Sequence, residues 1–489
     1  MKRILAAILI AAACLPILVS CEKDNTAEST TAGANSDTTA NTEEIPSSTL
    51  RSETKDSVPD NLKFTGEEFR VLYPNQGAYP LYYWAEEEPS SETMSEAVYR
   101  RQKYVEDRLG IKFVIEMDED YSNSKWLKTI ASGSHDYDLG MTHYSKNIDA
   151  FVVNNYITPF ENLEYVDFDK PWWNNQAMDA IAINGKHFYG VNDFLIPEPL
   201  ATFFNKQMIT DYELENPYQI VRDGRWTYDK MLEMGKVVAA DLNNDGKHTK
   251  DDQYGLVTQL NWYFNSLPES FGIKLAEIDP VTNRIMLTDK VGELQAALEI
   301  VSNLVNNKDV TFTFPYGAVS GDIYASPMPL STGRVLFHFD PLSRAMTYRE
   351  IEIDYGILPW PKGSDAQENY YSFNHTGFIA VPITTTNFAK TGAVLELLAA
   401  ESYRYVVPTY YKLMLGQKLA RDEESEEMLD IIYGSIVTDI GRNFTNGFAI
   451  QSGFTNLLEA GSTAFVSYYE KNAAIAQAHL DEISDIVLN

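Results

Sequence analysis

Cysteine is almost absent from this chain, and the folded part must do without it. Only Cys14 and Cys21 occur among the 489 residues, and both lie close to the N-terminus. Disulfide bonds and catalytic thiols are therefore excluded from everything downstream. The protein has to be stabilised by its hydrophobic cores or by a bound metal ion.

Positive charge is also scarce. The chain has 39 lysine and arginine residues against 70 aspartate and glutamate residues, which gives a formal net charge of −31. Such an acidic surface repels nucleic acid and anionic lipid, and it favours solubility. Aromatic residues make up 12% of the chain, and 489 residues are enough for two or three cores. Nucleic acid is therefore not expected as a partner, and disorder throughout the chain is excluded.

Several catalytic motifs are missing. The Gly-Lys pairs at Gly185, Gly235 and Gly246 lack the leading glycine of a phosphate-binding loop. The histidines form no HExxH pattern, and no GxSxG elbow is present. A pair of carboxylates for glycoside hydrolysis stays open, because 70 acidic residues offer many pairs whose separation is invisible in sequence.

The N-terminus has the organisation of an export signal. Two basic residues precede an apolar run over residues 4–13, which is too short to span a bilayer. The sequence Leu-Val-Ser-Cys, ending at Cys21, resembles the bacterial lipobox, in which the cysteine is acylated and becomes the new N-terminus. We expect residues 1–20 to be removed and an acyl chain such as palmitate on Cys21 to anchor the protein at the outside of the cell membrane. Ordinary cleavage at the same place, without a lipid, is the alternative.

The segment that follows predicts a tether. Residues 21–60 are rich in serine, threonine, alanine, asparagine and acidic residues, with few large apolar side chains. Such a segment cannot bury enough surface to offset the chain entropy, so we expect it to be disordered. A glycosylated stalk is the alternative.

Strand and helix patterns alternate at the start of the folded part. Residues 69–73 predict a strand, followed by a helix that starts at an N-cap, Ser95, and ends at Gly110. Residues 111–115 and 137–141 predict two more strands, with a short helix between them. This βαβαβ order predicts an α/β lobe with a parallel sheet.

In such a sheet, ligands bind beyond the carboxyl ends of the strands. This rule points to the loop after Tyr73 and to the loop after Met141, which reads Thr142-His143-Tyr144. Hydroxyl, imidazole and phenol groups can donate hydrogen bonds and stack, so we expect these three residues to contact a ligand. For His143, an ordinary surface or core position is the alternative.

One metal site is predicted from spacing alone. Residues 241–252 place oxygen ligands at the positions of a calcium loop, with Gly246 at the sharp turn. The chain after the loop reads as a strand and position 12 is Asp, not Glu, so we expect one structural calcium ion of modest affinity. An empty acidic turn is the alternative. The expected ligands are Asp241, Asn243, Asp245, the carbonyl of Lys247, Thr249 and Asp252.

Several short segments stand in a characteristic order over residues 62–440. They are Glu96-Ala-Val-Tyr-Arg-Arg, Lys170-Pro-Trp-Trp-Asn, Phe188-Tyr-Gly, Phe203-Phe-Asn-Lys, Asn216-Pro-Tyr, Asp354-Tyr-Gly-Ile-Leu-Pro-Trp-Pro and Val407-Pro-Thr-Tyr-Tyr. Together they resemble the extracellular solute-binding proteins of sugar-type ABC importers, family 1. The resemblance implies an α/β fold of the two-lobed, periplasmic-binding-protein-like type II, with a hinge between the lobes and the ligand in the cleft.

The resemblance also implies a discontinuous chain path. Crossings between the lobes are expected near residues 193–198 and near residues 374–382. The expected lobes are 61–194 with about 376–440 for the first, and about 197–372 with 441–489 for the second.

Aromatic residues carry the substrate prediction. Sugar rings present apolar faces that pack on tryptophan and tyrosine, while their hydroxyl groups need polar partners. Trp84, Trp262 and Tyr263 are the aromatic candidates. The polar candidates are Asp193, at the first crossing, and Asp340, after a hydrophobic strand. The alternatives are core packing for the aromatic residues and turn or cap roles for the two aspartates.

These observations predict a monomeric, lipid-anchored binding protein that captures a carbohydrate, expected to be an oligosaccharide, for an ABC permease in the membrane. No enzymatic step is expected. Ligand contacts to both lobes would favour a closed state. The alternatives are a surface-anchored glycan-acting enzyme, a binding protein for another solute such as a peptide, and a surface lipoprotein without a transport role.

Overall fold

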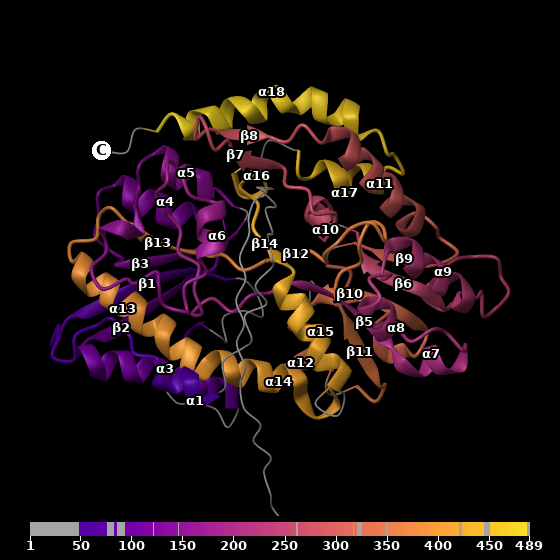
Figure 1. The fold of residues 1–489 in the computed structure, drawn as a ribbon, viewed down its shortest axis with the longest axis horizontal. Coiled ribbons are helices and arrows are strands. Elements are labelled where there is room, and N and C mark those ends of the chain that lie inside the picture. Colours follow the sequence, from indigo (N-terminus) through magenta and orange to yellow (C-terminus); the bar gives the residue numbers. More distant parts are fainter. Residues whose placement is uncertain are drawn as a thin grey trace, which may run out of the picture. The chain divides into compact units, whose positions relative to one another are not determined.

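The computed structural model describes most of the chain beyond the expected export signal. The described residues are 48–75, 83–85, 93–120, 122–144, 146–260, 263–315, 317–319, 325–348, 351–419, 423–444 and 450–486. Residues 45–489 form one unit that contains two five-stranded sheets. Figure 1 shows the two sheets in separate places, each with helices around it.

The first sheet is built mainly from the N-terminal part. Its strands are β1 (Glu68–Pro74), β2 (Lys112–Asp118), β3 (Leu139–Thr142), β4 (Ile157–Thr158) and β13 (Phe378–Pro382). The order is β2-β1-β3-β13-β4, with β1 parallel to both β2 and β3, which confirms the predicted parallel βαβαβ unit. β13 returns from far along the sequence and pairs antiparallel with β3 and β4.

The helix after β1 starts earlier than predicted. α3 spans Thr93–Leu109, so the predicted N-cap at Ser95 is wrong and this residue lies in the first turn. Gly110 follows the helix as predicted, with a φ of +72°, a left-handed value that glycine adopts without a steric cost. The predicted short helix is α4, Ser124–Ala131.

The second sheet comes from the middle of the chain. Its strands are β5 (Leu200–Asn205), β6 (Tyr254–Gln259), β9 (Thr311–Phe314), β10 (Val335–Pro341) and β11 (Tyr355–Leu358). The order is β11-β5-β10-β6-β9, with β10 antiparallel to β5 and parallel to β6. Every residue of β5, β6 and β10 is buried, as expected for central strands covered on both faces.

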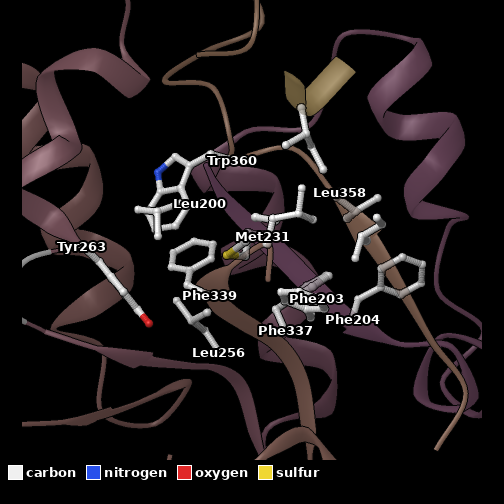
Figure 2. Packing of buried hydrophobic residues seen from close by; sticks show 14 of the residues in the cluster. Leu200, Phe203, Phe204, Met231, Leu256, Tyr263, Phe337, Phe339, Leu358 and Trp360 are labelled. Carbon is white, nitrogen blue, oxygen red and sulfur yellow. The ribbon is translucent and has the colours of Figure 1, made fainter. Parts of the chain in front are cut away.

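Each sheet has its own hydrophobic core. The second-lobe core surrounds β5, β6 and β10, and the first-lobe core surrounds β1, β3 and β13. In the second-lobe core, the rings of Phe339 and Trp360 stack with centroids 4.0 Å apart (Figure 2). Two separate cores are the physical basis of two lobes.

The other elements connect the strands and cover the sheets. Before the second sheet lie α1 (Ser48–Glu53), α5 (Ile148–Val153), η1 (Phe160–Asn162) and α6 (Asn175–Ala180). Within the second-sheet region lie α7 (Lys206–Asp211), α8 (Pro217–Arg222), α9 (Tyr228–Val238), η2 (Phe264–Ser266), α10 (Leu267–Ser270), β7 (Ala276–Ile278), β8 (Ile285–Leu287), α11 (Val291–Val305), η3 (Leu330–Thr332) and α12 (Arg344–Tyr348). After it lie β12 (Ser372–Phe373), α13 (Phe388–Glu401), η4 (Ser402–Val406), α14 (Val407–Leu419), α15 (Glu423–Gly434), β14 (Ile436–Val437), α16 (Ile440–Phe444), α17 (Gly453–Glu459) and α18 (Phe465–Ser484).

The chain crosses between the sheets more than once. The backbone N–H of Glu198 donates to Asn374 Oδ1 at 2.8 Å, and that of His375 donates to the Glu198 carbonyl at 3.2 Å. β12 and β14 pair in parallel, and Figure 1 shows them between the two sheets. The architecture is therefore α/β, with two mixed five-stranded sheets joined by crossing segments, and the predicted two-lobed fold class is confirmed.

One long helical segment also runs from one core to the other. α13 is buried in the first-lobe core, whereas Tyr410 and Met414 of α14 belong to the second-lobe core. Between them, η4 is a π-helix, a widened turn that is frequent at functional sites. The expected lobe boundary near residue 440 lies beyond α14 and α15, whose buried side chains pack in the second-lobe core.

The end of the expected tether is packed against the fold. The Arg51 guanidinium donates to the Tyr403 carbonyl at 3.2 Å and lies 4.4 Å from the ring of that tyrosine. Asp56 pairs with Arg404 at 3.1 Å, and Val58 is buried in the first-lobe core. The prediction of a disordered segment up to residue 60 is therefore wrong for residues 51–58, because their few charged and apolar side chains have specific partners.

The last helix also links the two cores. Phe465 of α18 is buried in the second-lobe core, and Leu480 and Ile483 are buried in the first-lobe core. His479 Nε2 lies 2.5 Å from Asp149 Oδ2 of α5. In the part of the chain that the structure describes, no helix is both long and apolar enough to cross a membrane.

Candidate functional site

The loop after β3 holds two of the predicted ligand residues, His143 and Tyr144. Their rings stack with centroids 4.6 Å apart and 26° between the ring planes. The backbone N–H of His143 donates to Asn123 Oδ1 at 3.2 Å, which fixes the loop against the start of α4. Both side chains are partly exposed, so the stacked pair offers an aromatic surface on which a sugar ring can pack.

Tyr144 is held by residues of two crossing segments. Its ring centroid lies 5.8 Å from that of Phe373 and 5.3 Å from that of His375. The Arg442 guanidinium lies 3.6 Å from the Phe373 ring centroid and 5.9 Å from that of Tyr144. Asn443 Nδ2 donates to the Tyr144 carbonyl at 2.9 Å. We call these five residues the Tyr144 cluster.

Arg442 extends the Tyr144 cluster to the second lobe. Its Nη1 donates to Ser266 Oγ at 2.9 Å and lies 3.7 Å from Glu269 Oε1. The side chains of Arg442 and Glu269 are 1% and 0% exposed. A buried guanidinium without polar partners is strongly destabilising, so Arg442 depends on Ser266 and Glu269.

A second cluster is centred on Asp340, at the carboxyl end of β10. The hydroxyl of Tyr263 donates to Asp340 Oδ1 at 2.8 Å, and the hydroxyl of Tyr348 donates to Oδ2 at 2.7 Å. Arg344 Nε lies 3.9 Å from Oδ1, and His338 Nδ1 lies 3.3 Å from Oδ2. The structure thus brings together two predicted site residues, Tyr263 and Asp340. We call these five residues the Asp340 cluster.

One short segment connects the two clusters. Tyr263 precedes η2 and α10, and the backbone N–H of Ser266 donates to the Tyr263 carbonyl at 3.1 Å. Residues 263–270 therefore contact both clusters. Tyr263 binds Asp340, and Ser266 and Glu269 contact Arg442. Tyr263, Asp340 and Arg442 are at most 2% exposed, so they support the site from beneath, whereas His143 and Tyr144 reach its surface.

Burial sets the charge of this region. It lowers the pKa of His143 to about 3, with Lys146 acting in the same direction, so the imidazole is neutral at physiological pH. It also lowers the pKa of His338. Burial raises the pKa of Glu269 to about 8, against the lowering effect of Arg442. Neutral rings and hydroxyl groups suit an uncharged ligand rich in hydroxyls better than a strongly charged one.

Three other predicted residues have different surroundings. Thr142 is fully buried, and its Oγ1 accepts a hydrogen bond from the backbone N–H of Phe378 at 3.3 Å, between β3 and β13. Trp84 is 7% exposed and packs in the first-lobe core, 5.1 Å from the ring of Phe194. Asp193, next to Phe194, is partly buried, and burial raises its pKa to about 7.

Trp262 and Cys21 lie outside the described residues. The stacking role of Trp262 and the lipid on Cys21 therefore stay predictions.

The predicted calcium loop has side-chain oxygens that accept bonds from its own backbone. Asp241 Oδ2 accepts from the N–H of Gly246 at 2.8 Å, Asn243 Oδ1 from that of Asp245 at 2.9 Å, and Asp252 Oδ2 from that of Thr249 at 2.8 Å. Within the described ranges, no three His, Cys, Asp or Glu side chains converge as a metal cluster. The calcium ion stays a prediction.

A small pocket lies between the first lobe and a crossing segment. Its volume of about 80 Å³ is well below the several hundred cubic ångströms of ordinary ligand sites, so it does not fit an oligosaccharide. It is lined by Asn174, Gln176, Ala177, Ala180, Lys274, Ile436, Val437 and Thr438.

Sequence reasoning missed the residues that hold the site together. Phe373, Arg442 and Glu269 come from three segments that meet only in the folded chain. The aromatic-polar run around Phe373 and His375 was visible in the sequence, but nothing marked Arg442 as buried.

Comparison with solved structures gives the class of this fold. An ABC substrate-binding protein from Listeria monocytogenes in complex with cycloalternan matches with a TM-score of 0.53 and 15% identity, over 85% of this chain and 98% of that one. The GacH receptor of Streptomyces glaucescens, solved unliganded and with acarbose, matches with a TM-score of 0.53 and 14% identity. The match covers 86% of this chain and 100% of the receptor chain. UgpB from Mycobacterium tuberculosis, in complex with glycerophosphocholine, matches with a TM-score of 0.54 and 17% identity. The match covers 83% of this chain and 99% of the UgpB chain.

The fold is therefore that of ABC substrate-binding proteins, over nearly the full length of each of these structures. No family model matches the sequence, and no curated protein matches it. At 13 to 17% identity the likeness shows the fold, and the solute has to be argued from the site.

Proposed function

We propose that this protein is a non-enzymatic, extracytoplasmic binding protein that captures a carbohydrate, of oligosaccharide size, for an ABC importer. The observation that carries the proposal is the two-lobed fold, which aligns with 97–100% of each sugar-bound neighbour. These neighbours are described with cycloalternan, acarbose and maltotriose. Glycerophosphocholine, in a further neighbour, is the main reason to test another solute class.

The site chemistry supports a sugar. The stacked His143 and Tyr144 rings are partly exposed, and stacked rings pack against the apolar faces of sugars. The two tyrosine hydroxyls of the Asp340 cluster bind the Asp340 carboxylate and keep this buried region polar beneath the aromatic surface. No step of bond cleavage is part of the proposal.

Thermal unfolding with a panel of solutes tests the proposal. Maltotriose, acarbose, cycloalternan, glycerophosphocholine and a mixed peptide pool are each added to the protein at increasing concentration. A ligand at 100 times its Kd stabilises the folded state by about 2.7 kcal/mol, which gives a visible rise in Tm. A rise with an oligosaccharide and none with the peptide pool is expected. The reverse pattern would assign the protein to another solute class, and release of shorter products would make it an enzyme.

Two finer features belong to the same proposal. The lipobox-like sequence ending at Cys21 supports an acyl anchor that keeps the binding protein beside its membrane permease. The spacing of residues 241–252 supports a structural calcium ion, as does the left-handed backbone at Gly246, with a φ of +72°.

A further inference from the structure

We propose that Arg442 is a positioning residue that joins the two halves of the solute site, so that the Tyr144 cluster and the Asp340 cluster are assembled together. This inference rests on the proposed function, because it concerns the same site. It does not depend on which solute binds.

On its first-lobe side, Arg442 holds the aromatic loop. Ile440 and Phe444, which flank it on α16, are buried in the first-lobe core. Its guanidinium lies 3.6 Å from the ring centroid of Phe373, a cation–π contact with the residue that also faces Tyr144. The neighbouring Asn443 binds the carbonyl of Tyr144 at 2.9 Å. Arg442 and Asn443 thus limit the positions that Tyr144 can take.

On its second-lobe side, Arg442 holds the segment that carries Tyr263. Its Nη1 binds Ser266 Oγ at 2.9 Å and pairs with Glu269 at 3.7 Å. Leu267, between those two residues, is buried in the second-lobe core. Since Tyr263 leads into this segment and binds Asp340, a shift of Ser266 and Glu269 is transmitted to the Asp340 cluster.

The backbone beside Arg442 is tied to the second lobe as well. The Asp439 carboxylate accepts a hydrogen bond at 2.6 Å from the backbone N–H of Leu275, which is buried in the second-lobe core, and one at 3.4 Å from that of Ala276, which is buried in the first-lobe core. It also accepts from the N–H of Gly441 at 2.8 Å. Residues 439–443 therefore have fixed partners in both lobes, which is the geometry needed for coupling.

The side chain has to be arginine for this purpose. The planar guanidinium places one face on Phe373 and one edge on Ser266 and Glu269, which a lysine ammonium cannot do at once. Because the Arg442 side chain is 1% exposed, separating the lobes at this point would take its guanidinium away from Ser266 and Glu269, the partners that compensate for its burial. If the two clusters can be either assembled or apart, the contacts of Arg442 increase the fraction of protein in which they are assembled. A solute that binds the assembled clusters then binds with higher apparent affinity.

Hydrogen exchange without any solute tests the coupling directly. In the Arg442→Met variant of the full chain, amide exchange in residues 139–144 and in residues 263–270 should both become faster, by about tenfold. Arg101→Met is the matched control, because Arg101 is equally buried at 1% but binds Ser402 and Tyr83. Faster exchange confined to residues 439–444, or the same pattern in the control, would overturn the inference.

Affinity provides the second measurement. For whichever solute of the panel binds the wild type, Arg442→Met should weaken binding by about tenfold or more, and Arg442→Lys by less. Equal affinity within twofold would overturn the inference while leaving the proposed function intact. If no solute binds the wild type, the proposed function fails, and hydrogen exchange still decides the coupling. If Arg442→Met does not fold, Ser266→Ala, which removes the hydroxyl oxygen that accepts from Arg442 Nη1, should show the same two exchange changes to a smaller extent.

Discussion

The hydroxyl of Tyr263 and the carboxylate of Asp340 are joined by a 2.8 Å hydrogen bond, although the two residues lie 77 positions apart in the chain. Tyr348 binds the other oxygen of the same carboxylate at 2.7 Å. Asp340 is 2% exposed, so these two hydroxyls replace water as its donors. Burial and the nearby Asp340 raise the pKa of both tyrosines well above the usual value, which keeps the hydroxyls protonated as donors.

Removing one donor should therefore be costly. We expect Tyr263→Phe and Tyr348→Phe each to lower the free energy of unfolding by about 1–3 kcal/mol, because a buried carboxylate loses a charge-assisted hydrogen bond. Urea denaturation measures the change. Tyr212→Phe, at a position 38% exposed, is the control and should change stability by less than about 0.5 kcal/mol. Equal effects at the three positions would mean that Asp340 does not depend on these hydroxyls.

The π-helix η4 and residues 51–58 allow a second prediction. Arg404 pairs with Glu401 at 2.5 Å and with Asp56 at 3.1 Å, and its own side chain is 8% exposed. Arg404→Ala should destabilise the protein by about 3 kcal/mol, because the buried Glu401 and the partly buried Asp56 lose their partner. It should also make residues 51–58 accessible to protease, which mass spectrometry of the fragments can show.

A surface ion pair serves as the control for that variant. Arg222 pairs with Glu424 and Glu427, but all three side chains are at least 30% exposed. Arg222→Ala should cost less than about 1 kcal/mol. If residues 51–58 are as resistant to protease in Arg404→Ala as in the wild type, the Arg404–Asp56 ion pair does not hold this segment in place.

These features separate what the sequence could predict from what it could not. Strands β1 to β3 were predictable because their alternation of apolar residues and the intervening helices are local patterns, and the glycine that ends α3 is a local signal. The rule on strand ends pointed to the loop that carries His143 and Tyr144, but it did not predict that their rings stack.

Contacts over long sequence separations were not predictable in this way. Arg442 meets Ser266 across 176 positions, and the burial of both Arg442 and Glu269 depends on the packing of two lobes. Trp84 is an aromatic candidate from the sequence, yet no local pattern shows that Phe113 and Phe194 enclose its ring in the first-lobe core. Residues 51–58 resembled a tether in composition, but Arg51 and Asp56 find partners on η4.

The contact between α18 and α5 predicts a pH dependence. His479 binds Asp149 and faces Glu482 at 3.6 Å, and its hydrogen bond to Asp149 raises its pKa above the usual value. The folded state therefore holds this proton more tightly than the unfolded state. The stabilisation is fully present below about pH 6.5 and is lost as the pH rises through the raised pKa.

The measurement compares two stability curves. Urea denaturation from about pH 6 to about pH 9 should show that His479→Gln loses less stability over this range than the wild type. His248→Gln is the control, because His248 is 45% exposed and its partner Asp309 is 81% exposed. A wild-type curve that parallels the His479→Gln curve would exclude a role for this proton.

Calcium removal is the test of the loop at residues 241–252. If the loop binds the ion, a chelator should lower Tm, and added calcium should restore it, because the ion binds only the folded loop. Asp245→Asn should abolish this response. It should change the Tm of the chelated protein little, because the backbone N–H of Lys247, which donates to Asp245 Oδ1 at 2.8 Å in the wild type, can donate to the asparagine amide oxygen instead. An unchanged Tm after chelation would leave an acidic turn held by its own hydrogen bonds.

The lipid anchor can be tested separately from solute binding. Cys21→Ala removes the only acylation site that the lipobox-like sequence offers, so the protein should move from the membrane fraction to the soluble fraction of cells. Affinity for the solute should stay unchanged, because the Tyr144 and Asp340 clusters contain no residue near the N-terminus. Mass spectrometry of the wild-type N-terminal peptide should show an acylated Cys21 as its first residue. Retention of the variant in the membrane fraction would contradict the anchor, and an unmodified wild-type peptide that begins at Cys21 would favour ordinary cleavage.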